Sequence, residues 1–186
     1  AQQILMRLDS PELGRLVQRF PTRVGDSYLI HPGIVHSIGA GNLILEVQEH
    51  NVSPYRLSNL GSDEPVDKEE QELALRAMQV ETRHNPRISR ESGALHHTRR
   101  IPLTPHCPHF AVDEIRLLDH IYLRTNGESF HLLVAVKGVM RVCPTGSEEA
   151  YAMAAGDVCC IPAVLGEYKV VTENGSSELL RISRPF

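Results

Sequence analysis

The second half of the sequence consists of short apolar runs separated by residues that favour turns. The runs that favour strands lie at 109–117, 120–125, 130–136, 139–143, 158–161, 168–172 and 178–183. Short runs divided by Gly, Pro and Asn are typical of antiparallel sandwiches and small barrels. The sequence therefore predicts a mainly β barrel over residues 108–186.

Two Asn-Gly pairs mark turns inside this region. Asn126-Gly127 follows the second run, and Asn174-Gly175 precedes the last run. Asn and Gly tolerate the positive φ that a type I′ hairpin turn requires at both central residues. We therefore expect a β-hairpin at each pair.

In the first half, two predicted turns precede a single histidine. The Gly-Asp pair at 25–26 predicts a tight turn, and residues 28–30 predict a short buried strand. The Pro-Gly pair at 32–33 predicts a second turn, which places His36 at the start of the next element. A histidine just past such a turn is expected to face whatever cavity the strands enclose.

Two further polar residues follow His36 at strand-like spacing. Residues 43–48 form an apolar run with one carboxylate, Glu46, whose burial would be costly without a partner. Arg56 follows and can supply a permanent cation. The three residues together predict a functional site. The alternatives are that the histidine is structural, that Glu46 faces solvent and that Arg56 bridges to an acidic neighbour.

A weak internal repeat connects the two halves. Residues 25–30 and 156–161 share the Gly-Asp turn and the apolar run that follows it. The alignment places Glu167 at the position of His36. A duplicated unit is therefore predicted, with the metal-type residue kept only in the first copy.

Two helices are expected in the first half. Asp9 or Ser10 can cap the first, whose apolar stripe consists of Leu13, Leu16, Val17 and Phe20. Asp67 and Glu70 have capping-box spacing and predict a second helix that runs through Met78. Residues 79–107 are rich in Arg, His, Asn and Pro with little periodicity, which predicts a connector.

Composition narrows the classes of function. A chain of 186 residues with 41% hydrophobic and 23% charged residues can form one or two packed domains. We expect three regions: a first region at 1–80 that carries the candidate site, a connector at 81–107 and a barrel at 108–186. A net charge of −4 gives no reason to expect nucleic acid or an anionic membrane as a partner. No apolar run approaches the roughly 20 residues of a membrane span.

The cysteines indicate a reducing compartment. Cys107, Cys143, Cys159 and Cys160 have no CxxC or zinc-finger spacing. Reduced, buried thiols in a cytoplasmic protein are therefore expected. The sequence leaves the oligomeric state open.

The segment that contains His36 is similar to a known family. The Gly-Asp strand, the Pro-Gly turn and the histidine resemble the second conserved motif of cupins, small β-barrels that hold a metal among histidines and a carboxylate. The longer run His36-Ser-Ile-Gly-Ala-Gly, Leu45-Glu46-Val47-Gln48 and Tyr55-Arg56 resembles the zinc-dependent type I phosphomannose (mannose-6-phosphate) isomerases. The likeness continues, less specifically, over residues 108–183.

The resemblance implies a cupin-type jelly roll in each half, a double cupin with an incomplete first barrel and a metal-free second one. It implies an enzyme that interconverts mannose 6-phosphate and fructose 6-phosphate with zinc as cofactor. In this view His36 is a zinc ligand, Glu46 an active-site carboxylate and Arg56 the arginine that acts on the sugar phosphate.

The chain also departs from that family. Asn51-Val52 replaces a Ser-Asp pair, residues 57–59 replace a Tyr-Asp pair, and His31 stands in place of proline. The other zinc ligands of the family, in Gln-x-His and Lys-Pro-Glu motifs, come from strands ahead of this point. Residues 1–9 hold neither motif, so we expect these 186 residues to be the carboxy-terminal part of a longer protein.

Two functions therefore remain open. The first is an isomerase that needs amino-terminal strands to complete its site. The second is a non-catalytic, cupin-like module that binds sugars or regulates a partner. The spacing of His36, Glu46 and Arg56 favours the first, and the departures at Val52 and Leu57 favour the second.

Overall fold

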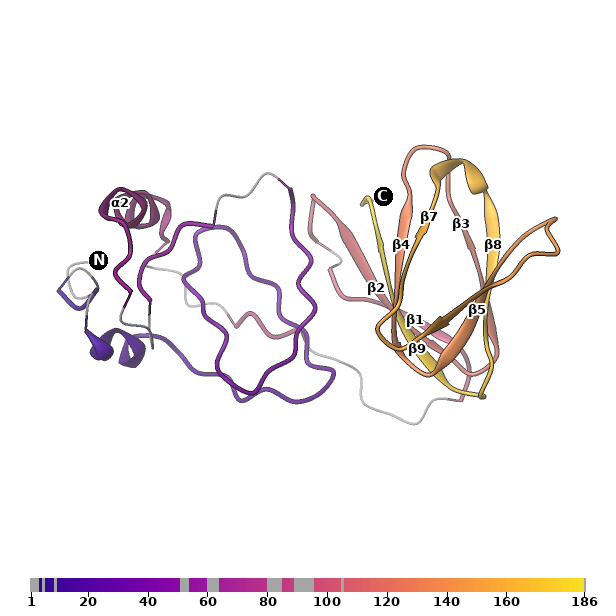
Figure 1. Ribbon diagram of the computed structural model, residues 1–186, viewed down its shortest axis with the longest axis horizontal. Helices are drawn as coiled ribbons and strands as arrows, with labels where there is room; N and C mark the ends of the chain where they lie inside the picture. Colours follow the sequence, from indigo (N-terminus) through magenta and orange to yellow (C-terminus); the bar gives the residue numbers. More distant parts are fainter. Residues whose placement is uncertain are drawn as a thin grey trace. The chain divides into compact units, whose positions relative to one another are not determined.

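The computed structural model divides the chain into two compact units, Ala1–Arg90 and Glu91–Phe186, called here the N-terminal and C-terminal units (Figure 1). The structure describes residues 4, 6–8, 10–50, 54–59, 64–79, 85–88, 96–104 and 106–185. Among these residues, no helix combines the length and the apolar character needed to cross a bilayer.

The C-terminal unit is built from two antiparallel sheets. Its strands are β1 (Arg99–Pro102), β2 (Ala111–Leu117), β3 (His120–Arg124), β4 (His131–Lys137), β5 (Val139–Pro144), β6 (Tyr151–Ala154), β7 (Val158–Ile161), β8 (Glu167–Thr172) and β9 (Ser177–Ser183), with a 3-10 turn, η2 (Ala163–Leu165). One sheet has the order β1-β2-β9-β4-β7 and the other β3-β8-β5-β6. Figure 1 shows them wrapped around a common interior. The predicted mainly β barrel is confirmed for this half of the chain, whereas the described residues of the N-terminal unit form no sheet of the expected first barrel.

The core of this barrel lies between the two sheets. Its buried residues are Ile115, Leu117, Leu123, Leu133, Ala135, Met140, Val142, Met153, Ile161, Tyr168, Val170 and Leu179. Both sheets contribute, because alternate residues of a strand point to the same face. Each buried Leu or Ile side chain stabilises the fold by about 1.5–3 kcal/mol.

Two strands were absent from the sequence-based prediction. β1 lies inside the segment predicted as a connector, and β6 lies between two predicted strands. The sequence of β1, Arg-Arg-Ile-Pro, carries charges and a proline because the strand lies at the edge of its sheet. An edge strand of this kind lacks the apolar alternation that identifies a strand in a sequence.

The expected type I′ hairpins are wrong. β3 and β4 lie in different sheets, as do β8 and β9, so each Asn-Gly pair crosses from one sheet to the other. Gly127 and Gly175 have φ of 83° and 75°, whereas no described residue other than glycine has positive φ. Asn126 and Asn174 therefore lack the geometry that type I′ requires. A crossing between sheets does not need the strand twist that this turn supplies.

The N-terminal unit contains less regular structure. A 3-10 turn, η1 (Pro11–Arg15), lies where an α-helix through residue 20 was expected. Ser10 caps it, since its hydroxyl accepts from the Glu12 amide at 3.2 Å; Asp9 lies outside the described residues. Leu16 is 41% exposed, so the predicted stripe is not buried as a whole. Short helices depend on such burial, which explains the early end.

The second helix forms as α2 (Lys68–Ala77), with Met78 as its C-cap. The Asp67 carboxylate accepts from the amides of Glu69 and Glu70 at 3.1 and 3.2 Å. The Glu70 side chain does not complete the predicted capping box, because it accepts from the backbone amide of Arg56 at 2.9 Å. Asp67 therefore caps the helix, and Glu70 joins it to the segment that contains Arg56.

The two strands expected in the N-terminal unit are wrong. Tyr28 makes only an isolated antiparallel bridge with Arg87, and residues 43–48 are not a strand. Leu43 is fully exposed, and Ile44 and Leu45 are each 51% exposed. A strand is stabilised by hydrogen bonds and side-chain pairs with a neighbour, and no described segment pairs with 43–48.

The repeated Gly-Asp turn has the same geometry in both units. Asp26 Oδ2 accepts from the amide three residues earlier at 2.8 Å, and Asp157 Oδ2 does the same at 2.8 Å. The preceding glycines, Gly25 and Gly156, have φ of 87° and 98°. The local turn is therefore duplicated, although only the second copy continues into a strand of a sheet.

Candidate functional site

His36 lies beyond the Pro-Gly turn, as the sequence predicts, and it is exposed. The turn is closed by a hydrogen bond from the Ile34 amide to the His31 carbonyl at 3.2 Å. The His36 Nδ1 lies 2.9 Å from the Ile34 carbonyl oxygen. Because that oxygen can only accept, Nδ1 is the donor in this contact, and Nε2 is the ring nitrogen that could bind a metal. This is the tautomer that a metal ligand needs, with its second nitrogen held by a carbonyl.

Arg56 is held by its backbone, and its residue surface is exposed. Its amide donates to Glu70 Oε1 at 2.9 Å. The next residue, Leu57, accepts at its carbonyl from Gln71 Nε2 at 3.1 Å. Leu57 is buried with Leu8 and Ala74 in the small core of the N-terminal unit. The backbone at Arg56 is therefore fixed, while its guanidinium can reach a ligand.

Glu46 lies on the exposed segment 43–48 and is itself exposed. In the described part of the chain, no hydrogen bond or ion pair joins Glu46, His36 and Arg56 to one another. Nor do the described residues contain a group of three or more His, Cys, Asp and Glu that could hold a metal ion. A shared site built from these three residues stays a prediction. Asn51-Val52, where the sequence departs from the resembling family, lies outside the described residues.

Arg87 supports the turn that leads to this region. Its guanidinium pairs with Asp26 and donates to the Pro21 carbonyl at 2.9 Å. It also lies 5.8 Å from the centre of the Tyr28 ring, within range of a cation–π contact. The pKa of Asp26 is lowered, first by the hydrogen bond from the Arg23 amide and then by that from Arg87. The turn is therefore stabilised by a residue 61 positions away in the sequence.

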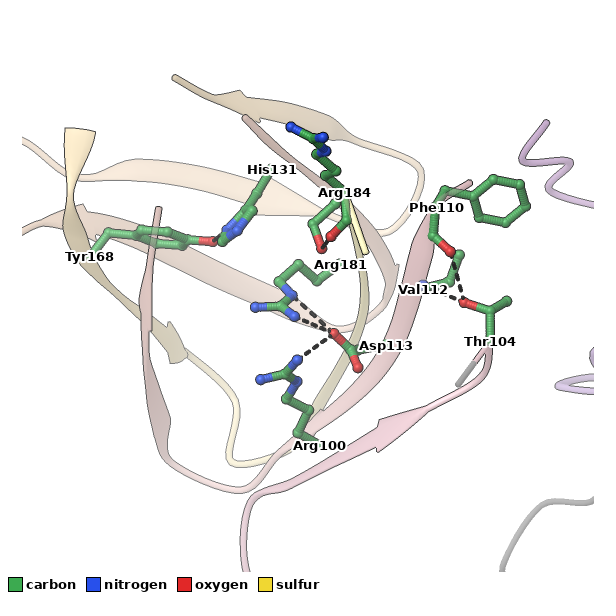
Figure 2. A network of polar contacts seen from close by, with 10 residues as sticks. Arg100, Thr104, Phe110, Val112, Asp113, His131, Tyr168, Arg181 and Arg184 are labelled. Carbon is green, nitrogen blue, oxygen red and sulfur yellow. Dashed lines mark hydrogen bonds and ion pairs between the residues drawn. The ribbon is translucent and has the colours of Figure 1, made fainter. Parts of the chain in front are cut away.

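The C-terminal unit contains a second polar cluster, called here the barrel cluster: Arg100, Asp113, His131, Tyr168 and Arg181. Arg181 donates through Nε at 3.0 Å and through Nη2 to Asp113 Oδ2, and Arg100 reaches the same oxygen at 3.1 Å. Figure 2 shows both guanidinium groups converging on this carboxylate. Arg181 and Asp113 are 2% and 3% exposed, so the pair is held inside the barrel. Buried charges require such partners.

His131 and Tyr168 form the neutral part of the barrel cluster. His131 Nδ1 lies 2.7 Å from the Tyr168 hydroxyl (Figure 2). Burial, followed by the positive charges of Arg181 and Arg100, lowers the pKa of His131 from 6.5 to about 4, although Asp113 acts in the opposite direction. Burial also raises the pKa of Tyr168. At neutral pH the cluster therefore contains two cations, one carboxylate and two neutral hydrogen-bonding groups.

Several of these residues were not identified from the sequence. Asp113 lies among four consecutive buried residues of β2, and Arg181 occupies a buried position of β9, where burial alternates along the strand. A charged residue at an inward position of an apolar strand is the signal that could have revealed them. Glu70 was identified only as a capping residue, and its contact with Arg56 has no local sequence signal.

Comparison with known proteins gives one distant sequence relative to report. No family model matches the chain. The chain is 27% identical over 177 residues to the mannose-6-phosphate isomerase ManA of Bacillus subtilis (strain 168). The alignment covers 91% of this chain and 53% of the relative. The chain therefore spans about half the length of the curated relative it matches.

Several solved structures resemble about half of the chain. A cupin-2 domain protein from Shewanella frigidimarina NCIMB 400 has a TM-score of 0.41 at 11% identity, covering 50% of this chain and 85% of its own. A cupin-superfamily sugar phosphate isomerase from Silicibacter pomeroyi DSS-3 has a TM-score of 0.37 at 16% identity, covering 47% and 59%. KdgF from a Halomonas species has a TM-score of 0.41 at 14% identity, covering 51% and 84%.

Proposed function

We propose that this chain is part of a zinc-dependent isomerase that interconverts mannose 6-phosphate and fructose 6-phosphate. The alignment with a mannose-6-phosphate isomerase over 91% of the chain supports the reaction. The single structural observation that carries the proposal is the state of His36, whose Nδ1 is held by the Ile34 carbonyl at 2.9 Å. With Nδ1 held by a carbonyl, Nε2 of this exposed residue is the nitrogen that would bind the metal.

The residues have separate roles in this proposal. The reaction moves a proton between two neighbouring carbons through an enediol, and the oxygens on those carbons develop negative charge. Zinc, when bound, supplies a Lewis acid for these oxygens. Arg56 binds the phosphate group through its planar guanidinium, which matches phosphate better than a lysine does. Glu46 lines the site, and its carboxylate orients a sugar hydroxyl.

The proposal extends to the organisation of the protein. His36 is one ligand, and tight zinc binding requires three or more protein ligands. We propose that the remaining ligands come from strands ahead of residue 10 in a longer protein. Residues 1–80 then belong to the catalytic domain, 81–107 connect it and 108–186 form a barrel without metal. The four cysteines are free thiols, which supports a cytoplasmic location.

Turnover of mannose 6-phosphate by the full-length protein, with and without a chelator, tests this function. Activity should disappear with chelator and return with zinc. Arg56→Ala should raise KM for the sugar phosphate, because a phosphate contact is lost, whereas Arg15→Ala on the exposed surface should not. Sugar phosphate binding without turnover under any metal would overturn the isomerase and support the non-catalytic module.

A further inference from the structure

Helix α2 contacts both of the segments that carry proposed site residues. At its N-terminal end, Glu70 Oε1 accepts from the Arg56 amide at 2.9 Å, and Gln71 Nε2 donates to the Leu57 carbonyl at 3.1 Å. The two bonds hold adjacent peptide groups of one segment. An amide that donates to an ionised carboxylate makes one of the stronger hydrogen bonds of a protein.

The C-terminal end of α2 contacts the turn before His36. The Gln79 amide donates to the Gly33 carbonyl at 2.9 Å. Gly33 has φ of 82°, and a Cβ added there would lie 2.7 Å from the Ala77 carbonyl oxygen. Only glycine can supply this backbone conformation at this distance from the helix end without a shift. The turn is therefore seated directly against α2.

From these contacts we propose that α2 is a brace that sets the spacing between His36 and Arg56, with Glu70 as the positioning residue for Arg56. The helix suits this role because it is rigid and capped at Asp67, and because Ala74 packs with Leu57 in the core. A rise of about 1.5 Å per residue fixes the distance along the helix between Glu70, which contacts Arg56, and Ala77, which lies against Gly33. The catalytic part of the inference rests on the proposed function, whereas the brace itself does not.

The first test measures the brace without any reaction. In the full chain, Glu70→Ala should increase amide hydrogen exchange at Arg56 by about tenfold, because the amide loses its acceptor. Glu72→Ala is the matched control, since Glu72 is an exposed acidic residue of the same helix. Gly33→Ala should shift the ring resonances of His36. Unchanged exchange at Arg56 in Glu70→Ala would overturn the proposal, whatever the activity.

The second test uses mannose 6-phosphate turnover by the full-length protein. Glu70→Ala should lower kcat/KM by about 10- to 100-fold, mainly through KM, because a small displacement of a binding group is costly. Glu70→Gln keeps an oxygen acceptor and should restore most of this loss. Equal losses in Glu70→Gln and Glu70→Ala would contradict positioning through the hydrogen bond. A wild-type protein that turns over no sugar phosphate would instead remove the proposed function and leave the exchange result standing.

Discussion

Each unit contains the same Gly-Asp turn, at 25–26 and at 156–157, but the residues after the two turns fold differently. Asp26 and Asp157 each accept from the amide three residues earlier at 2.8 Å. After Asp157 the chain becomes β7, which pairs with β4. After Asp26 the chain makes a single bridge, between Tyr28 and Arg87. The turn is therefore determined by local chemistry, whereas the strand depends on a neighbour with free ladder positions.

The two units also differ in how deeply they bury their apolar residues. The apolar residues after the second turn include Ile161, which is 3% exposed in the barrel core. In the N-terminal unit, the apolar residues of 43–48 include Leu43, which is fully exposed. Leaving a Leu in water forgoes about 1.5–3 kcal/mol of stabilisation. The barrel is therefore expected to supply most of the measurable stability of this chain, and the following experiments test that difference.

The largest effect is expected from the buried ion pair of the barrel. Arg181→Ala should destabilise the C-terminal unit by about 3–5 kcal/mol, because Asp113 would remain buried without its main partner. Hydrogen exchange at the β4 and β9 amides of the full chain measures this loss. Arg141→Ala is the control, because its pair with Glu173 is exposed and should contribute about 1 kcal/mol or less. Equal losses of stability in Arg181→Ala and Arg141→Ala would show that burial does not determine how much the Arg181–Asp113 pair contributes.

A pH-dependent effect is expected from His131. Its folded pKa of about 4 lies below the ordinary 6.5, so between these values the unfolded chain binds the extra proton. Stability should therefore fall as pH falls from 6.5 to 4, by up to about 3 kcal/mol. His131→Gln removes the titrating group and should flatten this slope in denaturant titrations. Identical slopes would mean that burial and the charges of Arg181 and Arg100 do not lower the pKa of His131 in the folded chain.

The strand pattern explains how much of the barrel could be predicted. Residues 158–161 were predicted as a strand and form β7 with the same bounds, because a short apolar run between turn signals identifies a strand. The sheet in which a strand lies has no local signal, so the two Asn-Gly crossings were predicted as hairpins. The buried pair of Asp113 and Arg181 depends on registry between β2 and β9, which are far apart in sequence.

The proposed site was predictable to a smaller extent. The position of His36 after its turn follows from Pro and Gly preferences, and the structure places it there. The contact of Glu70 with Arg56 spans 14 residues and competes with the capping box that the local sequence predicts. A local sequence pattern predicts a capping box correctly only when the glutamate side chain has no better partner elsewhere in the chain.

A smaller loss is expected at a crossing between the two sheets. Gly138 has φ of 80°, and a Cβ there would lie 2.6 Å from Ser177 Oγ and 2.8 Å from the Ser176 carbonyl oxygen. Gly138→Ala should destabilise the barrel by about 2 kcal/mol through strain and crowding. Gly156→Ala also has positive φ but meets nothing within 4 Å, so its loss should be about 1 kcal/mol. Thermal denaturation of the full chain compares the two, and a larger loss at Gly156 would reverse the argument.

The smallest effect compares the duplicated turns directly. Asp157→Ala should raise amide exchange at Ala154 and destabilise the barrel by about 1 kcal/mol, because the turn is continuous with β7. Asp26→Ala should raise exchange at Arg23 and at the bridge between Tyr28 and Arg87, and leave the β4 and β9 amides unchanged, because its turn leads to one bridge. Asp26→Asn and Asp157→Asn keep an oxygen acceptor and should recover most of each effect. If Asp26→Ala instead destabilised the chain as much as Asp157→Ala, the turn itself, rather than the strand that follows it, would carry the stability.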